Sequence, residues 1–310
     1  MEPTTTGVDA GVDGFVLRRA AAGNLLPRPG AGHSPQRLLS TLLGEYWVDC
    51  EESLPLGALV DLLTEFGISE TSARATVTRL AKRGMLEMER VGRLTRYRIT
   101  AEGRLDVGEQ GRAIRGFAAR PRDWDGRWTV AAFSVPEEQR QVRHHLRNYL
   151  RWLGFASLFD GLWVAPRGST ATLEQMFRTV GVDQFAAFRT SDDPSGREPL
   201  TAWDLSGVEA AYRTFVAEHR PLLDTLDATT PARALVTRTR VFEAWRTFPT
   251  LDPDLPQAWL PDGWPREEAR ALFVALYNGL AGPATARFRQ LVAAHDPAVA
   301  QRAGERLLPA

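Results

Sequence analysis

Residues 67–100 read GISETSARATVTRLAKRGMLEMERVGRLTRYRIT, and they carry the most specific pattern in the chain. Ser69 is placed to cap a helix, and Gly84 is placed to end it. After Gly84, residues 86–91 and 95–99 form two short runs of strand-forming residues. The order of helix, turn and two strands is typical of the second half of a winged helix-turn-helix, which places its second helix in the major groove of DNA.

One face of the helix after Ser69 has the properties of a DNA-reading surface. At about 100° per residue, Ala73, Val77 and Leu80 share one side and predict a buried face. The opposite side is short, polar and basic, with a small alanine at its centre: Thr71, Arg74, Ala75, Thr78 and Lys82. Small residues let a helix enter the groove, and arginine and hydroxyl groups reach phosphates or base edges. We therefore predict that this side binds DNA, with Arg74 as the best candidate for a bidentate contact to guanine.

The predicted hairpin after this helix is basic. It carries Arg90, Arg93 and Arg96 around Gly92, and cations on a protruding hairpin suit the minor groove or the flanking phosphates. The alternative is a solvated basic hairpin on an unrelated fold. Because the helix, turn, basic helix and basic hairpin occur together in the right order, the combination favours DNA binding. The total charge gives no sign of it, since 38 basic residues are balanced by 38 acidic residues.

Working outward, the chain divides into segments of different pattern. Residues 1–33 are rich in Gly, Thr, Pro and Ala, and we expect a disordered arm. Residues 34–120 are predicted to form the winged-helix domain, and residues 126–191 follow the order β-α-β-β-α-β of a ferredoxin-like domain. Residues 200–310 show mostly helical periodicity. The predicted fold class is α+β, with an N-terminal winged helix-turn-helix, a central ferredoxin-like domain and a mostly helical C-terminal domain.

Several classes of function lack their sequence signature. Cys50 is the only cysteine, which excludes an intrachain disulfide and a thiolate metal cluster. His144 and His145 are adjacent, so their side chains diverge on a helix, and the other histidines complete no metal-ligand spacing. There is no phosphate-binding glycine loop, no nucleophile elbow and no apolar run near the ~20 residues of a membrane span. We expect a cytoplasmic protein without metal, cofactor, membrane partner or enzymatic activity.

Beyond these patterns, long stretches of the sequence resemble a known family. Besides residues 67–86, these are SPQRLLSTLLGEY at 34–46, WDGRWTVAAFSVPEEQRQVRHHLRNYLRWLGFASLFDGLWVAPRG at 124–168 and FPTLDPDLPQAWLPDGWP at 248–265. They look like the PaaX family, which are GntR-like winged-helix repressors of phenylacetic acid catabolism. The resemblance implies a homodimeric repressor that an aryl-CoA or acyl-CoA effector, such as phenylacetyl-CoA, releases from operator DNA. It also implies dimerisation through the central domain, and effector binding or dimerisation through residues 200–310.

The segment expected to be helical over 232–248 holds the candidate effector-binding residues. They are Arg238, Arg240, Trp245 and Arg246. An aryl-CoA ligand needs cations for its phosphates and an aromatic-lined pocket for its ring. The alternative is an ordinary amphipathic helix with its arginines outside and its aromatic side chains in the core.

The central domain of the family is similar to the small ferredoxin-like nuclease of CRISPR adaptation, which holds a metal with an Asp at the end of its first strand. In this chain the strand ends Phe-Ser-Val-Pro at 133–136, and the first carboxylate after it is Glu137. Asp160 lies in a predicted turn, where aspartate is common for conformational reasons. We therefore expect the fold without the activity. A metal-dependent nuclease and a DNA-bound scaffold without a ligand are the two alternative functions.

Overall fold

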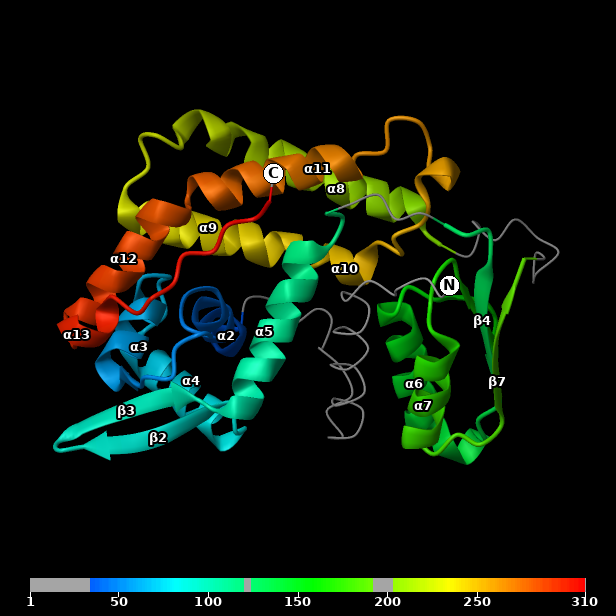
Figure 1. Cartoon of the computed structure of the whole chain (residues 1–310), viewed down its shortest axis with the longest axis horizontal. Coiled ribbons are helices and arrows are strands. Elements are labelled where there is room, and N and C mark those ends of the chain that lie inside the picture. Colours follow the sequence, from blue (N-terminus) through cyan, green and yellow to red (C-terminus); the bar gives the residue numbers. More distant parts are fainter. Residues whose placement is uncertain (1–33, 120–123, 192–202, 310) are drawn as a thin grey trace, which may run out of the picture. The chain divides into compact units, whose positions relative to one another are not determined.

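The computed structural model describes residues 34–119, 124–191 and 203–309. The N-terminal arm expected over residues 1–33 lies outside the described residues. The chain forms two compact units, which are described separately below. The first unit contains residues 30–115, 214–245 and 268–310, and the second contains residues 116–213 and 246–267. Figure 1 shows the elements of both units in the colours of the sequence.

The N-terminal part of the first unit consists of three helices and a small antiparallel sheet. The helices are α2 (Pro35–Tyr46), α3 (Leu56–Thr64) and α4 (Glu70–Lys82). The strands β1 (Leu54–Pro55), β2 (Leu86–Val91) and β3 (Leu94–Ile99) pair in the order β1-β3-β2. Leu54 and Pro55, directly before α3, pair with Tyr97 and Arg96 as a short strand.

The helix ends predicted at Ser69 and Gly84 are confirmed, and Ser34 and Gly67 have the same roles at neighbouring helices. The Ser34 hydroxyl accepts a hydrogen bond from the Arg37 amide, and the Ser69 hydroxyl accepts one from the Ser72 amide at 3.4 Å. Each bond satisfies an amide that the first turn of a helix leaves without a partner. Gly67 and Gly84 follow α3 and α4 with φ of +79° and +77°, a backbone conformation that favours glycine. These caps fix where α4 begins and ends.

A long helix, α5 (Ala101–Gly116), leads out of the small sheet. The Thr100 hydroxyl caps it by accepting a hydrogen bond from the Gly103 amide at 3.0 Å. α5 approaches α2 closely, because a Cβ atom added to Gly44 would clash with the side chain of Val107. Glycine therefore permits the two helices to touch at this point.

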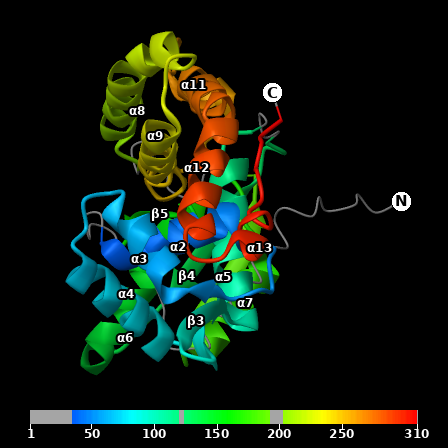
Figure 2. The same cartoon turned by 90° about the vertical axis from the view of Figure 1, so that its left-hand side faces the viewer.

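Helices from the C-terminal third complete the first unit. They are α9 (Pro231–Trp245), α11 (Arg266–Gly279), α12 (Ala281–Ala293) and the short α13 (Pro297–Ala300), with the 3-10 helix η3 (Arg220–Thr225) before them. The preceding helix α8 (Leu205–His219) is divided, because its residues 205–213 belong to the second unit. α9 and α12 lie over the side of α2 and α3 that faces away from the β2–β3 hairpin (Figures 1 and 2). Their buried side chains join one hydrophobic core, in which the Phe288 ring stacks on Tyr46 at 4.8 Å. The buried side of α4, the helix that carries DNA-binding candidates on its other side, therefore shares a core with the C-terminal helices.

The second unit contains a four-stranded antiparallel sheet. Its elements are β4 (Trp128–Phe133), the 3-10 helix η1 (Glu137–Gln139), α6 (Arg140–Trp152), β5 (Ala156–Phe159), β6 (Leu162–Ala165), α7 (Thr170–Thr179) and β7 (Phe185–Thr190). The strand order is β5-β6-β4-β7. The expected order β-α-β-β-α-β is confirmed by these elements.

The two faces of this sheet are covered differently. Side chains of α6 and α7 pack against one face, around Trp163 and Phe177. On the other face, Trp128 contacts Trp124, Trp203 and Trp259. The last of these lies in the connector that also contains α10 (Phe248–Leu251) and the 3-10 helix η4 (Gln257–Trp259). The connector is held through Asp254, which pairs with Arg167 at 3.1 Å.

Candidate nucleic-acid interface

The two sides of α4 differ in burial as the sequence predicts. Ala73, Val77 and Leu80 are buried in the core of the first unit. On the opposite side Thr71, Arg74, Thr78 and Lys82 are exposed, while Ala75 between them is half-buried. The structure therefore brings the five predicted residues to one outward face of the helix. Arg79 and Arg83, which the sequence interpretation did not include, are also exposed at the edge of this face.

The polar groups on this face differ in what they can still bind. The Thr78 hydroxyl donates its proton to the backbone oxygen of Arg74 at 3.0 Å, so it presents its oxygen as an acceptor. The side chains of Arg74 and Lys82 form no hydrogen bond or ion pair with any residue in the described part of the chain. An unpaired arginine keeps its full fork of N–H donors for a planar acceptor such as the edge of guanine.

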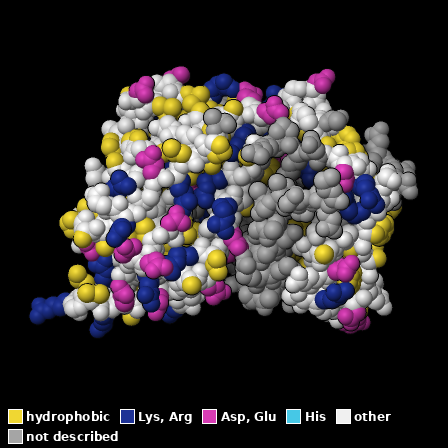
Figure 3. Space-filling view, viewed as in Figure 1, with side chains coloured by type: hydrophobic (Ala, Val, Ile, Leu, Met, Phe, Trp, Pro, Cys, Tyr) yellow, Lys and Arg dark blue, Asp and Glu magenta, His cyan; other side chains and the backbone are white. Residues whose placement is uncertain are grey.

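The β2–β3 hairpin extends beyond the body of the first unit (Figure 1). Gly92 turns it with φ +61°, so that Val91 and Leu94 are paired across the strands directly beside the turn. Arg90 and Arg93 are exposed, and neither forms an ion pair within the described ranges. Blue Lys and Arg side chains project at the end of the hairpin at the lower left of Figure 3. Its tip is therefore a site where cations are available.

The hairpin also carries apolar side chains that the sequence interpretation missed. Met88, Val91 and Leu94 are each 55% exposed. Alternation along a strand accounts for Val91 and Leu94, which lie on the face opposite to the buried Tyr97. It does not account for Met88, which is paired with Tyr97 and is nevertheless exposed. Single exposed apolar residues are common on protein surfaces, but here they lie next to unpaired arginines on a projecting element. The end of the hairpin therefore presents apolar side chains as well as cations.

Arg96 differs from the expectation and requires a correction. It was expected at the basic tip, but its side chain is only 11% exposed. Its Nη1 lies 2.7 Å from Asp296 Oδ2, and its Nε donates to the Ser53 hydroxyl at 2.9 Å. The hydrogen bond from Arg96 lowers the pKa of the Asp296 carboxyl below its usual value. Arg96 thus fastens the hairpin to the segment before α13, because its donors already have acceptors within the first unit.

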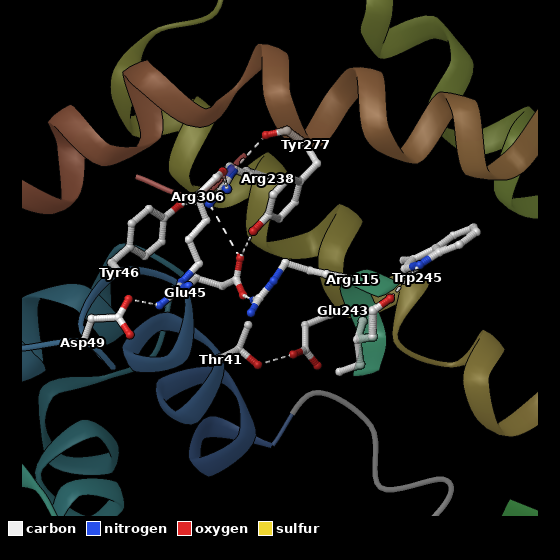
Figure 4. Close-up of polar contacts among 11 residues, drawn as sticks. Thr41, Glu45, Tyr46, Asp49, Arg115, Arg238, Glu243, Trp245, Tyr277 and Arg306 are labelled. Carbon is white, nitrogen blue, oxygen red and sulfur yellow. Dashed lines mark hydrogen bonds and ion pairs between the residues drawn. The ribbon is translucent and has the colours of Figure 1, made fainter. Parts of the chain in front are cut away.

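Arg238, the first of the effector candidates, also differs from the expectation. It was expected on the exposed side of an amphipathic helix or at a ligand, yet it is 1% exposed. Its Nε donates to the Tyr277 backbone oxygen at 3.0 Å, its Nη1 to the Tyr46 hydroxyl at 3.0 Å and its Nη2 to the Arg306 backbone oxygen at 2.7 Å. Figure 4 shows these groups converging on the guanidinium. Arg238 therefore joins α9 to α2, α11 and the C-terminal segment.

The other effector candidates do not join Arg238 in a shared ligand site. Arg240 is exposed and lies two residues after Arg238, which places it on the other side of α9. Trp245 is fully buried, and its Nε1 donates to the Ile114 backbone oxygen at 3.1 Å. Arg246 follows the end of α9 and is half-buried. The sequence placed these side chains on one segment, but a shared segment does not give them a shared environment.

A buried carboxylate completes the network around Arg238. Glu45 of α2 accepts hydrogen bonds from Arg115 and from the Tyr277 hydroxyl, and its Oε2 lies 3.8 Å from Arg238 (Figure 4). Burial raises the pKa of the Tyr277 hydroxyl. For Arg238, burial alone would lower the pKa, but Tyr46, Tyr277 and Glu45 outweigh it and raise the pKa above its ordinary value. The charges of this network therefore satisfy one another.

The carboxylates that a nuclease would need are dispersed or paired. The Asp160 side chain is fully exposed and lies 3.3 Å from Arg147. Glu137 pairs with Arg140 and Arg143, and the hydrogen bond from Arg143 lowers the pKa of Glu137. Across the described residues, no three His, Cys, Asp or Glu side chains lie close enough together to hold a metal ion. The described part of the central sheet thus offers no metal-binding cluster.

Three family descriptions match successive parts of the chain. They are "PaaX-like protein" over residues 34–103, "PaaX protein central Cas2-like domain" over 121–202 and "PaaX-like protein C-terminal domain" over 203–291. The chain belongs to the PaaX family. A relative in Escherichia coli (strain K12), named "Transcriptional repressor PaaX", is 29% identical over 261 residues, which cover 80% of this chain and 81% of that protein.

A solved structure resembles the fold of this PaaX family member. It is "Uncharacterized protein Rv0674 from Mycobacterium tuberculosis", with a TM-score of 0.55 and 23% sequence identity. The match covers 82% of this chain and 98% of that one. The architecture is therefore mixed α and β, with antiparallel sheets and a helical C-terminal part. Among the helices described, none has both the length and the hydrophobicity of a membrane span.

Proposed function

We propose that this chain is a DNA-binding transcriptional repressor whose N-terminal part is a winged helix-turn-helix. The observation that carries the proposal is the outward face of α4, where Arg74 and Lys82 have no partner among the described residues although the opposite face is buried. Unpaired cations on a short helix beside a projecting basic hairpin form the electrostatic footprint of a DNA-binding module. The repressor name of the E. coli relative supports the same function.

Each residue of the interface has a role in this proposal. Arg74 donates two hydrogen bonds to a guanine, and Thr78 accepts a hydrogen bond from a base amino group. Ala75 lets the helix approach the groove, and Thr71 lies in the first turn, where free amides favour a phosphate. Lys82, Arg90 and Arg93 contact the phosphate backbone. Arg96 acts on DNA only by holding the hairpin in position, since its donors are bonded to Ser53 and Asp296.

The second unit has the strand order β5-β6-β4-β7, which is that of a ferredoxin-like domain. We propose that this unit forms the interface of a homodimer. Two copies related by a two-fold axis would present two α4 helices to one face of the DNA. Their half-sites would lie about 10 bp apart, or a multiple of that spacing, in a near-palindromic sequence. The family resemblance supports dimerisation of this part of the chain.

The proposal includes release from DNA by an aryl-CoA or acyl-CoA effector such as phenylacetyl-CoA. A ligand changes DNA affinity only if it binds the DNA-incompetent form better than the competent one. The first unit offers a physical route for such coupling, because α9 and α12 share a hydrophobic core with α2, α3 and α4. A ligand that moves the C-terminal helices therefore also acts on the helices that position α4.

The test is selection of binding sites from random duplex DNA with the purified full chain. We expect an enriched near-palindrome, a dimer by light scattering, and loss of the complex with phenylacetyl-CoA but not with free coenzyme A. Failure to enrich any sequence would contradict the repressor. Enrichment that no acyl-CoA or aryl-CoA reverses would favour the DNA-bound scaffold. Cleavage of the duplex in Mg²⁺ or Mn²⁺ that Asp160→Ala abolishes would favour the nuclease.

A further inference from the structure

Arg270, in the second turn of α11, is a buried cation without a partner. The residue is 8% exposed, and its Nη1 is buried without a hydrogen bond. Among the described residues no carboxylate lies within ion-pair distance of it. Arginine stays protonated in proteins, so this charge cannot be removed by losing a proton at neutral pH. Burial, with no compensating charge, lowers the pKa of the Arg270 guanidinium to about 10.

Arg238 and Arg266, the other arginines that are buried as whole residues in the described part of the chain, are satisfied. Arg238, in the same unit, bonds to three oxygen atoms and lies near Glu45. Arg266, one turn before Arg270 on the same helix, donates to both carboxylate oxygens of Asp252 at 2.8 and 2.9 Å. Buried charges in folded proteins are normally paired, because an unpaired one is costly. Arg270 is therefore an exception that calls for an explanation.

Two aromatic rings lie against the guanidinium of Arg270. Its central carbon is 5.8 Å from the centre of the Trp245 ring and 5.4 Å from that of Phe273. The two rings stack on each other at 4.8 Å with an interplanar angle of 7°, and both are fully buried. Cation–π contacts offset part of the lost hydration, but they use the face of the group and give the buried Nη1 no acceptor.

This geometry matches the needs of one class of ligand. The planar fork of an arginine fits the two oxygens of a carboxylate or phosphate. The stacked rings of Trp245 and Phe273 are themselves fully buried, so they form a wall beside the guanidinium. From the sequence, cations and aromatic rings for an anionic ligand were expected together on the single segment that contains Arg238. In the structure, Trp245 of α9 meets a cation that comes from α11 instead.

We infer that Arg270, packed against Trp245 and Phe273, forms part of a binding site for a small ligand that carries an oxyanion, either carboxylate or phosphate. Ligand binding at this site requires no DNA. Only its consequence for repression rests on the proposed function, since the site lies in the same unit as α4. When bound, the oxyanion supplies the acceptors that Arg270 lacks.

Calorimetry and thermal melting of the full chain test the inference. The probes are inorganic phosphate, phenylacetate, coenzyme A and phenylacetyl-CoA, and the variant is Arg270→Met. We expect the variant to melt at a higher temperature than the wild type without ligand, because it removes an unpaired buried charge. We also expect it to bind at least one probe roughly 30-fold more weakly, which corresponds to about 2 kcal/mol. The matched control is Arg233→Met, an exposed arginine at the start of α9 that should change neither quantity.

The probes distinguish the sources of the oxyanion. Binding of phenylacetate that depends on Arg270 identifies a carboxylate, whereas binding limited to the coenzyme A compounds identifies a phosphate. Arg270→Lys keeps the charge but loses the fork, so it should fold and bind more weakly than the wild type even if Arg270→Met does not fold. Three results overturn the inference: no probe binds the wild type, both variants bind as tightly as the wild type, or Arg270→Met folds with a lower melting temperature. Because no DNA is present, these results stand apart from the test of repression.

Discussion

The outward face of α4 and the network around Arg238 use the same residue type in opposite ways. Both belong to the first unit, and both are built around arginine. On α4 the guanidinium of Arg74 is exposed and has no partner among the described residues. In the network, Arg238 is buried and its donors meet three oxygen atoms from α2, α11 and the C-terminal segment. The hydrogen-bond and ion-pair partners of an arginine therefore decide whether it holds this fold together or remains available to a ligand.

This difference explains how a chain without net charge can bind DNA. The formal charge of +0 counts every arginine equally. Arginines such as Arg96 and Arg238 are neutralised within the fold, whereas Arg74 and Arg93 remain available to phosphates and bases. Affinity for nucleic acid depends on such local availability. The comparison also makes Arg270 conspicuous, since it is buried like Arg238 but unpaired like Arg74.

The largest expected effect comes from breaking the buried network. Arg238→Met removes three N–H donors, each of which bonds to a different oxygen. It also leaves the Tyr46 hydroxyl without its partner. Removing one member of a buried charged network typically costs about 3–5 kcal/mol of stability. We therefore expect the free energy of unfolding in urea to fall by roughly that amount. Arg233→Met, an exposed arginine on the same helix, is the control and should leave the midpoint unchanged.

A contrary result would change the account of the first unit. If Arg238→Met unfolds at the same urea concentration as the wild type, the shared hydrophobic core alone holds α9 to α2. The coupling route from the C-terminal helices to α4 would then depend on packing around residues such as Phe288, and not on the charged network.

An intermediate effect is expected for Arg74 on the outward face of α4. Arg74→Ala should relax the preference for one base pair of the selected operator, at a cost of about 1–3 kcal/mol for the preferred base. The reason is that a bidentate contact to guanine is lost while the phosphate contacts remain. Titration of the operator and of its single-base variants measures the change. Arg178→Ala, an exposed arginine on α7 that pairs with Glu174, serves as the control.

A different result for Arg74→Ala would change the role assigned to this residue. Equal weakening on the operator and on unrelated DNA would show that Arg74 contacts phosphate. In that case base recognition would have to come from Thr78 or from the hairpin, and the role assigned to α4 would be wrong in detail.

The sequence predicted the parts of this structure that depend on local pattern. The helical period separates the buried Ala73 and Val77 from the exposed Arg74 and Lys82, and the structure confirms that division. The caps at Ser69 and Gly84 are likewise local, because they depend on the conformation of one or two residues. The order of strands and helices in the second unit could likewise be predicted from local hydrophobic periodicity.

The parts that the sequence did not predict depend on distant partners. Arg96 looked like a tip residue, but Asp296 lies two hundred positions further along the chain. For Arg238, helical periodicity could indicate only the direction of the side chain. It could not indicate the oxygen atoms that the guanidinium bonds to there. Leu54 and Pro55 become a strand only because β3 pairs with them. The meeting of Arg270 with Trp245 joins two helices, so no single segment could indicate it.

The smallest expected effect concerns the hairpin tip and separates positioning from recognition. Arg93→Ala removes an exposed cation beside the turn at Gly92. We expect binding to all DNA sequences to weaken by a similar factor, and the slope of log affinity against log salt concentration to become shallower by about one. Titrations of the operator and of unrelated DNA at several salt concentrations measure both quantities. An unchanged slope together with a changed base preference would mean that Arg93 reads bases in the minor groove, where it would act like Arg74 instead of contrasting with it.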